Sequence, residues 1–354
     1  MTKKYDTLVF IGRFQPVHNA HLEIIKHAAK LTNELVIIVG SSNQPRTFKN
    51  PFTYEDRFDM LKSAINGYKF DMLKSSVDGV RDDIDDTTIV IESLTDNMYN
   101  DQAWAAEVQN IVSRYSGPKV GIIGHKKDES SFYLDMFPQW EFESVPLFEP
   151  LDATSIRNLY FVDNVNFNFI QGVVPHCVLN FLRDFSKTKE YQQIISERKF
   201  IENYKQQFAN LPYPPIFVTV DSVVIQSGHV LMIKRRSEPG KGLWALPGGF
   251  LNANTDRSVE DAMVRELREE TGIKIPVPVL KGSVKNNRVF DAIGRSARGR
   301  TITHAFKIVL PDGELPKVKG QDDAVKAKWI PFSEIRSEDC FEDHYNIISY
   351  FLGT

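Results

Sequence analysis

Two histidines three residues apart are the first side chains whose types and spacing could do chemistry. His18 and His21 stand in the segment Gly12–His21, which reads GRFQPVHNAH. On a helix, residues three apart share one face, so the two imidazoles would point to the same side. Such a pair serves as metal ligands, as donors to a phosphate, or as a solvated surface pair. The start of a helix exposes free N–H groups and a positive dipole end, which favour an anion.

A second group of side chains that could do chemistry is acidic. Glu266, Glu269 and Glu270 stand at positions i, i+3 and i+4 of one segment. On a helix they form a single face on which like charges repel. A divalent cation would relieve this repulsion, and ligands that are all oxygen suit Mg²⁺ or Mn²⁺. A solvated charged face is the alternative for such a cluster.

The segments around the histidines alternate between strand and helix signals. Strands are predicted at Thr7–Ile11, Leu35–Val39, Ile89–Ile91 and Val120–Ile123, and helices at Ala20–Leu31, Phe58–Ile65 and Gln102–Tyr115. Strand, helix and strand within roughly 40 residues predict a βαβ unit and a parallel sheet. We therefore expect a doubly wound, Rossmann-like α/β domain that binds its ligand at the carboxyl ends of the strands. The histidines follow the first strand at that edge, which favours phosphate over metal or solvent.

The composition and the pattern of predicted elements change after the first half of the sequence. Residues 186–210 are polar with spaced apolar side chains and predict an exposed connecting helix, which ends at the breaker Leu211–Pro215. New strands are predicted at Ile216–Ile225, Val230–Lys234, Thr301–Leu310 and Ala327–Pro331, with one helix at Val259–Thr271. This is an α+β pattern. We expect domains at residues 1–186 and 214–354, joined by a linker helix and hinge at 187–213.

Composition limits the class of protein. Among 354 residues, 42% are hydrophobic and 25% charged, and the net charge of −3 gives no basic field for nucleic acid. Cys177 and Cys340 lie too far apart in sequence for a metal motif, and they predict reduced thiols in the cytoplasm. No apolar run reaches the length of a signal-peptide core or a membrane span. We expect no membrane partner, and a homo-oligomer stays open.

Three ordered motifs in the first half carry a family resemblance. Gly12–His21 resembles the GxFxPxHxGH signature of the HxGH nucleotidyltransferases, and its GRFQP opening is similar to nicotinamide mononucleotide adenylyltransferases of the archaeal type. Asn50–Arg57 resembles the NPFT…R segment of that family, and Thr154–Arg157 its (S/T)xxxR motif. Ala20 stands where the family prefers glycine. The resemblance implies adenylyl transfer from ATP to nicotinamide mononucleotide, which gives NAD and pyrophosphate.

The same resemblance assigns roles around the phosphates. It implies that His18 and His21 hold the triphosphate and its developing charge, while Arg13 and Arg157 clamp the β- and γ-phosphates as planar donors. Catalysis would then consist of positioning and charge stabilisation without a protein nucleophile. Mg²⁺ is expected to accompany ATP, held largely by phosphate oxygens and water. Four further substrate contacts are implied at Gly12, Phe14, Arg57 and Ser155.

The nicotinamide ring needs an aromatic platform. The family has an Asn-x-x-Trp pair, and the resemblance assigns the stacking role to Trp104. Asn100 stands four residues before Trp104 and Asp101 three, so the partner of the carboxamide is either of these two. The alternative for Trp104 is a core tryptophan on an amphipathic helix.

The second half also resembles a family. Leu246–Phe250, reading LPGGF, precedes Arg265–Ile273, reading RELREETGI, and together they resemble the Nudix box of the Nudix hydrolases. The resemblance implies that Glu266, Glu269 and Glu270 bind Mg²⁺ or Mn²⁺, with Glu269 and Glu270 catalytic. It also implies that two glycines, Gly248 and Gly249, contact the substrate.

One departure from the Nudix pattern G-x5-E-x7-R-E-U-x-E-E-x-G-U lies in the loop before the acidic helix. Arg257 occupies the position of the first glutamate, and seven residues instead of five separate it from Gly249. Since the three metal-binding glutamates are intact, we expect metal binding to survive. The geometry of the loop stays open.

The substrate of the second half is indicated by two more segments. Val289–Thr301 and Phe341–His344 resemble parts of ADP-ribose-type Nudix proteins. Arg295, Arg298 and Arg300 would contact a diphosphate or ribose phosphate, Arg298 being our assigned contact, or they form a solvated basic turn. The implied reaction is hydrolysis of ADP-ribose to AMP and ribose 5-phosphate, with a metal ion that activates water.

The leading hypothesis is a bifunctional enzyme of NAD metabolism whose partners are the small molecules ATP, nicotinamide mononucleotide and ADP-ribose. One alternative keeps the transferase and makes the Nudix half a non-catalytic metabolite sensor, for which Arg257 argues and the intact glutamates argue against. A second alternative changes the acceptor to a pantetheine phosphate or a polyol phosphate, against which the GRFQP and NPFT motifs and Trp104 argue. A pure interaction module leaves both clusters unexplained.

Overall fold

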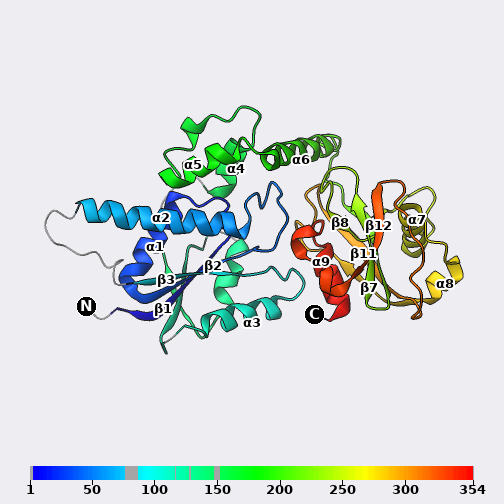
Figure 1. The fold of residues 1–354 in the computed structure, drawn as a ribbon, viewed down its shortest axis with the longest axis horizontal. Coiled ribbons are helices and arrows are strands. Elements are labelled where there is room, and N and C mark those ends of the chain that lie inside the picture. Colours follow the sequence, from blue (N-terminus) through cyan, green and yellow to red (C-terminus); the bar gives the residue numbers. More distant parts are fainter. Residues whose placement is uncertain (1–2, 76–86, 116, 127–128, 147–151, 354) are drawn as a thin grey trace. The chain divides into compact units, whose positions relative to one another are not determined.

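The computed structural model describes residues 3–75, 87–115, 117–126, 129–146 and 152–353 (Figure 1). The chain divides into two compact units, Met1–Ile195 and Ser196–Thr354. The division falls in helix α6 (Lys189–Gln206), inside the predicted linker at 187–213. Among the described helices, none has the length and hydropathy needed to cross a membrane.

The first unit is built on a five-stranded sheet with the order β3-β2-β1-β4-β5. Its strands are β1 (Tyr5–Gly12), β2 (Thr32–Val39), β3 (Thr88–Ser93), β4 (Val120–Gly124) and β5 (Glu141–Ser144). Every neighbouring pair is parallel, so the carboxyl ends of all five strands lie at one edge. The predicted doubly wound, Rossmann-like α/β fold is confirmed.

Both faces of this sheet are buried. Leu8 and Phe10 of β1 pack in one apolar cluster, while Val9 and Ile11 pack in another. Successive side chains of a strand point to opposite faces, so a strand that is covered on both sides reads as a continuous apolar run. This is why Thr7–Ile11 and Leu35–Val39 were recognisable in the sequence.

The helices of the first unit follow the strands in alternation. They are α1 (Asn19–Leu31), α2 (Tyr54–Ser75), α3 (Asp101–Val112), α4 (Ala153–Tyr160) and α5 (His176–Phe185), with short 3-10 helices η1 (Glu129–Asp135) and η2 (Phe167–Phe169). The predicted helix at Ala20–Leu31 is correct to one residue, and Phe58–Ile65 is the middle of a longer helix. The sequence did not reveal β5, because it has four residues, of which two are exposed.

The second unit contains a mixed sheet with the order β10-β11-β6-β7-β12, to which β8 and β9 add short pairings. Its strands are β6 (Phe217–Gln226), β7 (His229–Arg235), β8 (Trp244–Ala245), β9 (Gly248–Phe250), β10 (Val284–Phe290), β11 (Thr301–Val309) and β12 (Ala324–Pro331). Strands β6 and β11 are parallel, and the other pairs are antiparallel. The α+β prediction is confirmed.

Helix α7 (Val259–Thr271) has the predicted bounds because its ends carry clear signals. The Ser258 side chain accepts a hydrogen bond from the N–H of Asp261, and Gly272 ends the helix at φ +61°. Met263 and Leu267 face the core. The other helices are α8 (Val277–Gly282), α9 (His344–Leu352) and the 3-10 helices η3 (Phe332–Glu334) and η4 (Ser337–Asp339).

Two candidate active sites

The loop after β1 folds back on itself. Phe14 adopts a positive φ of 53° and is buried, with its ring centroid 4.8 Å from that of His21. A Cβ atom on Gly12 would lie 2.9 Å from the Phe14 ring, so a larger residue would displace it. Gly12 and Phe14, both predicted to contact substrate, shape the loop that holds the histidines.

The two histidines of the first motif lie together at the start of α1. The backbone N–H of His18 donates to Nδ1 of His21 at 3.2 Å, and the ring centroids are 3.7 Å apart. Burial lowers the pKa of His18 to about 4, and burial together with His18 lowers the pKa of His21 well below its usual range. Both rings are therefore neutral, and Nε2 of His21 carries its proton and is a donor. Nδ1 of His18 is buried without a hydrogen-bond partner in the described residues.

Arg57, a predicted substrate contact, is hydrogen-bonded to the loops around the site. Its side chain is fully buried and donates to four backbone carbonyls, those of Arg13, Gly40, Ser41 and Thr53. These carbonyls belong to the loops that follow β1 and β2 and to the turn before α2. The guanidinium of Arg57 thus holds the loops around the site, and a contact between Arg57 and substrate stays a prediction.

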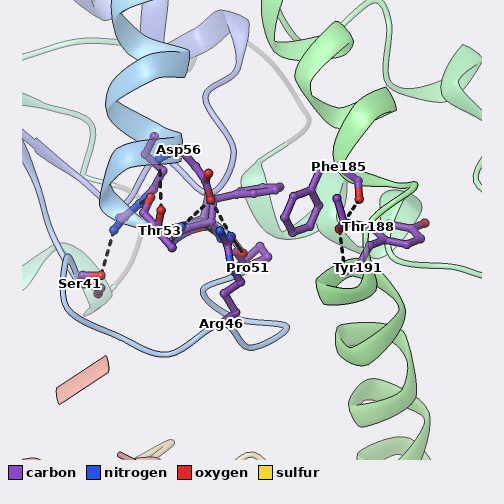
Figure 2. Close-up of polar contacts among 11 residues, drawn as sticks. Ser41, Arg46, Pro51, Thr53, Asp56, Phe185, Thr188 and Tyr191 are labelled. Atoms are coloured by element: carbon purple, nitrogen blue, oxygen red, sulfur yellow. Dashed lines mark hydrogen bonds and ion pairs between the residues drawn. The ribbon is translucent and has the colours of Figure 1, made fainter. Parts of the chain in front are cut away.

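The start of α2 is held by a reciprocal pair of hydrogen bonds. Thr53 N–H donates to the Asp56 carboxylate at 2.9 Å, and Asp56 N–H donates to the Thr53 hydroxyl at 3.3 Å (Figure 2). Arg46 reaches the same carboxylate at 2.6 Å and the carbonyl of Pro51 at 2.7 Å (Figure 2). The end of the NPFT segment is therefore held to the first turn of α2 by side-chain hydrogen bonds.

Gln15 and Arg157 bring the three predicted motifs together. The Gln15 amide makes two hydrogen bonds with the backbone of Phe52, at 2.9 and 3.0 Å. Arg157 Nη1 donates to the carbonyl of Gln15 at 2.7 Å, and Nη2 donates to the Thr154 hydroxyl at 3.1 Å. Burial, with the charge of Arg13, lowers the pKa of Arg157 to about 10. Its Nε is buried without a partner in the part of the chain that is described.

Two other side chains lie at this edge, and one of them, Ser155, belongs to the predicted set. Ser155 donates to the Asp152 carboxylate through its N–H at 2.8 Å and its hydroxyl at 3.0 Å, and so anchors the start of α4. Lys49 was not predicted. Lys49 is exposed, yet desolvation and the charges of Arg13 and Arg157 lower its pKa, so these three cationic groups act on one another. A lysine directly before the NPFT segment was the available signal.

Trp104 is half-buried on α3. Its ring centroid lies 6.2 Å from those of Tyr133 and Phe137, so part of the indole packs and part is accessible. The Asn100 side chain accepts a hydrogen bond from Ala103 N–H at 3.0 Å and caps the helix, while Asp101 is exposed in its first turn. Stacking by Trp104 and the choice between Asn100 and Asp101 stay predictions.

The second site forms where the glycine pair meets α7. A Cβ on Gly248 would lie 2.1 Å from the carbonyl oxygen of Val220, and one on Gly249 would lie 2.6 Å from Oε1 of Glu266. The N–H of Gly248 donates to Oε2 of Glu270 at 2.8 Å. A side chain at position 248 would collide with the backbone of β6, and one at position 249 would displace the Glu266 carboxylate.

The three predicted metal ligands differ in environment. Burial raises the pKa of Glu270 to about 8, and burial also raises the pKa of Glu266. Glu269 is exposed, and Nη1 of Arg265 donates to Glu266 at 2.8 Å and to Glu269 at 2.9 Å. Within the described residues, no three acidic, histidine or cysteine side chains form a ready metal cluster. A hard divalent cation beside Glu270 would nevertheless stabilise the ionised form of this buried carboxyl.

Asp256, next to the position of the missing first glutamate, pairs with the acidic helix. Its carboxylate accepts from Nε and Nη2 of Arg265 at 2.9 and 2.7 Å, while Arg257 is exposed. The longer loop closes on itself through the N–H of Asn252, which donates to Asp256 at 2.8 Å. The spacing of the family pattern places Arg257 at the position of the first glutamate, whereas the folded loop presents Asp256 to Arg265 of the helix.

The three arginines of the predicted substrate segment have different roles. Arg295 is buried and makes two 2.9 Å hydrogen bonds with Asp343, so its guanidinium is structural. Arg298 is half-buried, with its guanidinium 5.0 Å from the ring centroid of Phe250, and its contact with substrate stays a prediction. Nη1 of Arg300 is buried without a partner among the described residues.

A residue near the C-terminus is hydrogen-bonded to the segment that leads into Gly248 and Gly249. The N–H of Leu246 donates to Nδ1 of His344 at 2.8 Å. Burial lowers the pKa of His344 to about 3, so the ring is neutral and its Nε2–H lies 3.8 Å from Oδ1 of Asp221. The Thr303 hydroxyl donates to the same carboxylate at 2.6 Å.

Arg235, at the end of β7, was missed by the sequence analysis. Its guanidinium lies 4.0 Å from the ring centroid of Phe341, and its Nε donates to the carbonyl of Pro239 at 2.8 Å. The charges of Arg298 and Glu342 act on it. A basic end of a strand followed by Glu238 and a proline was the only signal in the sequence.

The two sites define an enzyme of two classes on one chain, a nucleotidyltransferase followed by a Nudix-type hydrolase. Residues 9–116 match the cytidylyltransferase-like family, and residues 215–351 match the NUDIX domain. A nicotinamide/nicotinic acid mononucleotide adenylyltransferase of Acinetobacter baylyi is 36% identical over 54% of this chain and 92% of its own length. An ADP-ribose pyrophosphatase of Methanocaldococcus jannaschii is 32% identical over 46% of this chain and 86% of its own length.

One solved structure is similar to both halves at once. The bifunctional NMN adenylyltransferase/ADP-ribose pyrophosphatase of Francisella tularensis, in complex with AMP and a manganese ion, is 35% identical over 99% of both chains, with a TM-score of 0.86. The chain belongs to this family of bifunctional NMN adenylyltransferase/ADP-ribose pyrophosphatases.

Proposed function

We propose that the protein transfers the adenylyl group of ATP to nicotinamide mononucleotide, and that it hydrolyses ADP-ribose to AMP and ribose 5-phosphate. The first activity is carried by the convergence of three motifs at Gln15, where Arg157 reaches the loop that holds His18. The second is carried by Glu270, which the Gly248 N–H holds beside Glu266. Both activities are those named for the relatives of the two halves.

In the transferase, the 5′-phosphate of the mononucleotide attacks the α-phosphorus of ATP, and the bond to pyrophosphate breaks. His21 can donate its Nε2–H to the phosphates. The negative charge of a bound triphosphate would raise the pKa of His18 and so stabilise a proton on this ring. Arg13, Lys49 and Arg157 surround this region with positive charge. Preorganised donors of this kind stabilise the charge that develops on the transferring group.

In the hydrolase, water attacks the diphosphate of ADP-ribose, and one P–O bond breaks. A divalent ion held by Glu266, Glu269 and Glu270 would neutralise the diphosphate and lower the pKa of the attacking water. Arg265 aligns Glu266 and Glu269, and Asp256 holds Arg265 in place. Arg298 is the proposed contact to the substrate. Because the Francisella protein was solved with manganese, Mn²⁺ is proposed beside Mg²⁺.

The test is product analysis on the purified full chain. NAD and pyrophosphate should form from ATP and nicotinamide mononucleotide, and a panel including the deamidated mononucleotide defines the acceptor. AMP and ribose 5-phosphate should form from ADP-ribose when Mg²⁺ or Mn²⁺ is added. Binding of ADP-ribose without AMP formation would instead support the sensor. The cytoplasmic location, the absence of a nucleic-acid partner and the oligomeric state stay predictions.

A further inference from the structure

Helix α6 carries a buried carboxylate that belongs to the second unit. Glu197 is 7% exposed, and its Oε1 accepts a hydrogen bond from the N–H of Gly240 at 3.2 Å. The two residues are 43 positions apart in sequence. A buried charge on a helix that otherwise reads as a polar connector needs a reason, because desolvation of a carboxylate is costly.

The turn that Glu197 caps is tightly constrained. Gly240 has φ +74°, and a Cβ at this position would lie 2.2 Å from the Phe341 ring. The N–H of Leu243 donates to the carbonyl of Gly240 at 3.0 Å, and the N–H of Gly242 donates to the carbonyl of Arg235 at 3.0 Å. The turn therefore closes directly on the end of β7.

Arg235 connects this turn to the hydrolase site through Phe341. The Phe341 ring contacts the ring of His344, whose Nδ1 accepts the N–H of Leu246, two residues before Gly248. The Nε of Arg235 is held by the carbonyl of Pro239, the residue before Gly240, and its guanidinium lies over Phe341. The charges acting on it include those of Arg298 and Glu270. Two guanidinium groups that repel each other beside a candidate metal ligand suit a ligand with two or more negative charges, such as a diphosphate.

We propose that Glu197 is a positioning residue of the hydrolase site, which acts through the Pro239–Gly240 turn to hold Arg235 toward the diphosphate of the substrate. This inference rests on the proposed hydrolase activity. It assigns the second half of α6 to the hydrolase, because a hydrolase domain that starts after the Pro-rich segment lacks this carboxylate.

The surroundings of Glu197 make its contribution sensitive to pH. The charged groups that face it are Glu238 in the turn, Glu342 before α9 and Arg235 on β7, and burial together with Glu238 raises its pKa to about 7. The ionised carboxylate is the stronger acceptor for the Gly240 N–H. As the pH falls through about 7, Glu197 takes up a proton and holds the turn less firmly.

The test compares three variants of the full-length protein. Glu197→Ala removes the acceptor, Glu197→Gln keeps an acceptor but removes the charge, and Glu202→Gln changes an exposed residue of the same helix whose partner is Arg198. Removing one such hydrogen bond should raise KM for ADP-ribose by about fivefold in Glu197→Ala, with a smaller change in kcat. Affinity for AMP, measured by calorimetry in EDTA, should fall in parallel. Glu202→Gln should match the wild type.

The pH profile separates positioning from a merely structural role. In the wild type, KM should rise as the pH falls through about 7. The ratio of KM in Glu197→Gln to KM in the wild type should exceed one at pH 8 and approach one at pH 6. A ratio independent of pH overturns the proposal. Equal KM values for Glu197→Ala and the control Glu202→Gln overturn it as well. If Glu197→Ala does not fold, the Glu197→Gln profile decides. A wild type that hydrolyses no ADP-ribose refutes the hydrolase function itself.

Discussion

Asp256 and Arg265 form a bidentate ion pair with N–O distances of 2.9 and 2.7 Å that joins the lengthened loop to the acidic helix. The Asp256 side chain is only 4% exposed, so its carboxylate is shielded from water although it lies in a loop. The ion pair leaves Nη1 of Arg265 free to hold Glu266 and Glu269. The loop thus presents a carboxylate to Arg265 one residue before the position at which the family pattern has a glutamate.

Asp256→Ala should therefore lower kcat for ADP-ribose hydrolysis. Loss of a residue that orients a metal ligand typically costs about 10- to 100-fold in activity or metal affinity. Arg257→Ala is the matched control, because Arg257 is exposed and should leave the rate unchanged. The measurement is the hydrolysis rate as a function of Mn²⁺ concentration. Equal rates for the two variants would show that the loop carboxylate has no such role.

Glu270→Gln and Glu269→Gln should each abolish divalent-dependent hydrolysis while NAD synthesis continues. The amide has the shape of the carboxylate without its charge, so the change tests charge and not packing. In Glu270→Gln, the affinity for Mn²⁺ should fall as well, which titration of the protein with the ion can measure. AMP formation that persists in both variants would place the metal site elsewhere.

His18→Ala should reduce NAD synthesis by ~10²–10³-fold, the usual cost of removing one preorganised donor. Hydrolysis of ADP-ribose by the same preparation reports that the chain is folded. His176→Ala, which changes an exposed histidine at the start of α5, is the control and should retain full synthesis. Near wild-type synthesis by His18→Ala would refute the assignment of the first motif.

Trp104→Ala should raise KM for the mononucleotide more than KM for ATP, because stacking on an aromatic ring is worth roughly 1–3 kcal/mol and only the mononucleotide uses it. Asn100→Asp retains the oxygen that caps α3 and removes the amide donor, so it tests carboxamide recognition without loss of the cap. Asp101→Asn tests the alternative partner. Equal changes in both KM values for Trp104→Ala would indicate a core tryptophan.

The boundary of the first unit should lie beyond Ser186. Tyr191 is buried in the first core, and its hydroxyl donates to the carbonyls of Tyr160 and Val162 at 2.6 and 2.9 Å. The N–H of Tyr191 donates to the hydroxyl of Thr188, and this hydroxyl in turn donates to the carbonyl of Phe185 (Figure 2). A fragment of residues 1–206 should be more stable to urea than one of residues 1–186. Equal denaturation midpoints would restore the earlier boundary.

Local spacing made much of the two sites predictable. The histidine pair, the glycine pair and the three glutamates act within one turn or helix, so their separation in sequence is close to their separation in space. Arg57 and Arg295 could not be assigned in this way, because a guanidinium that binds backbone carbonyls or an aspartate reads the same as one that binds phosphate. Glu197 and Arg235 depend on contacts between distant segments, which periodicity does not reveal.

The four carbonyl contacts of Arg57 have a consequence for the energetics of nucleotide binding. Loops that are already ordered lose little conformational entropy when a ligand arrives, so binding to the first unit should show a small entropic penalty for the protein. Amide hydrogens of Gly40, which donates to the carbonyl of Gly12, and of Ser42 should exchange slowly with solvent even without nucleotide. The edge proposed to bind phosphate would then be a preformed site for ATP. The association rate constant of ATP should therefore be that of binding without a conformational change.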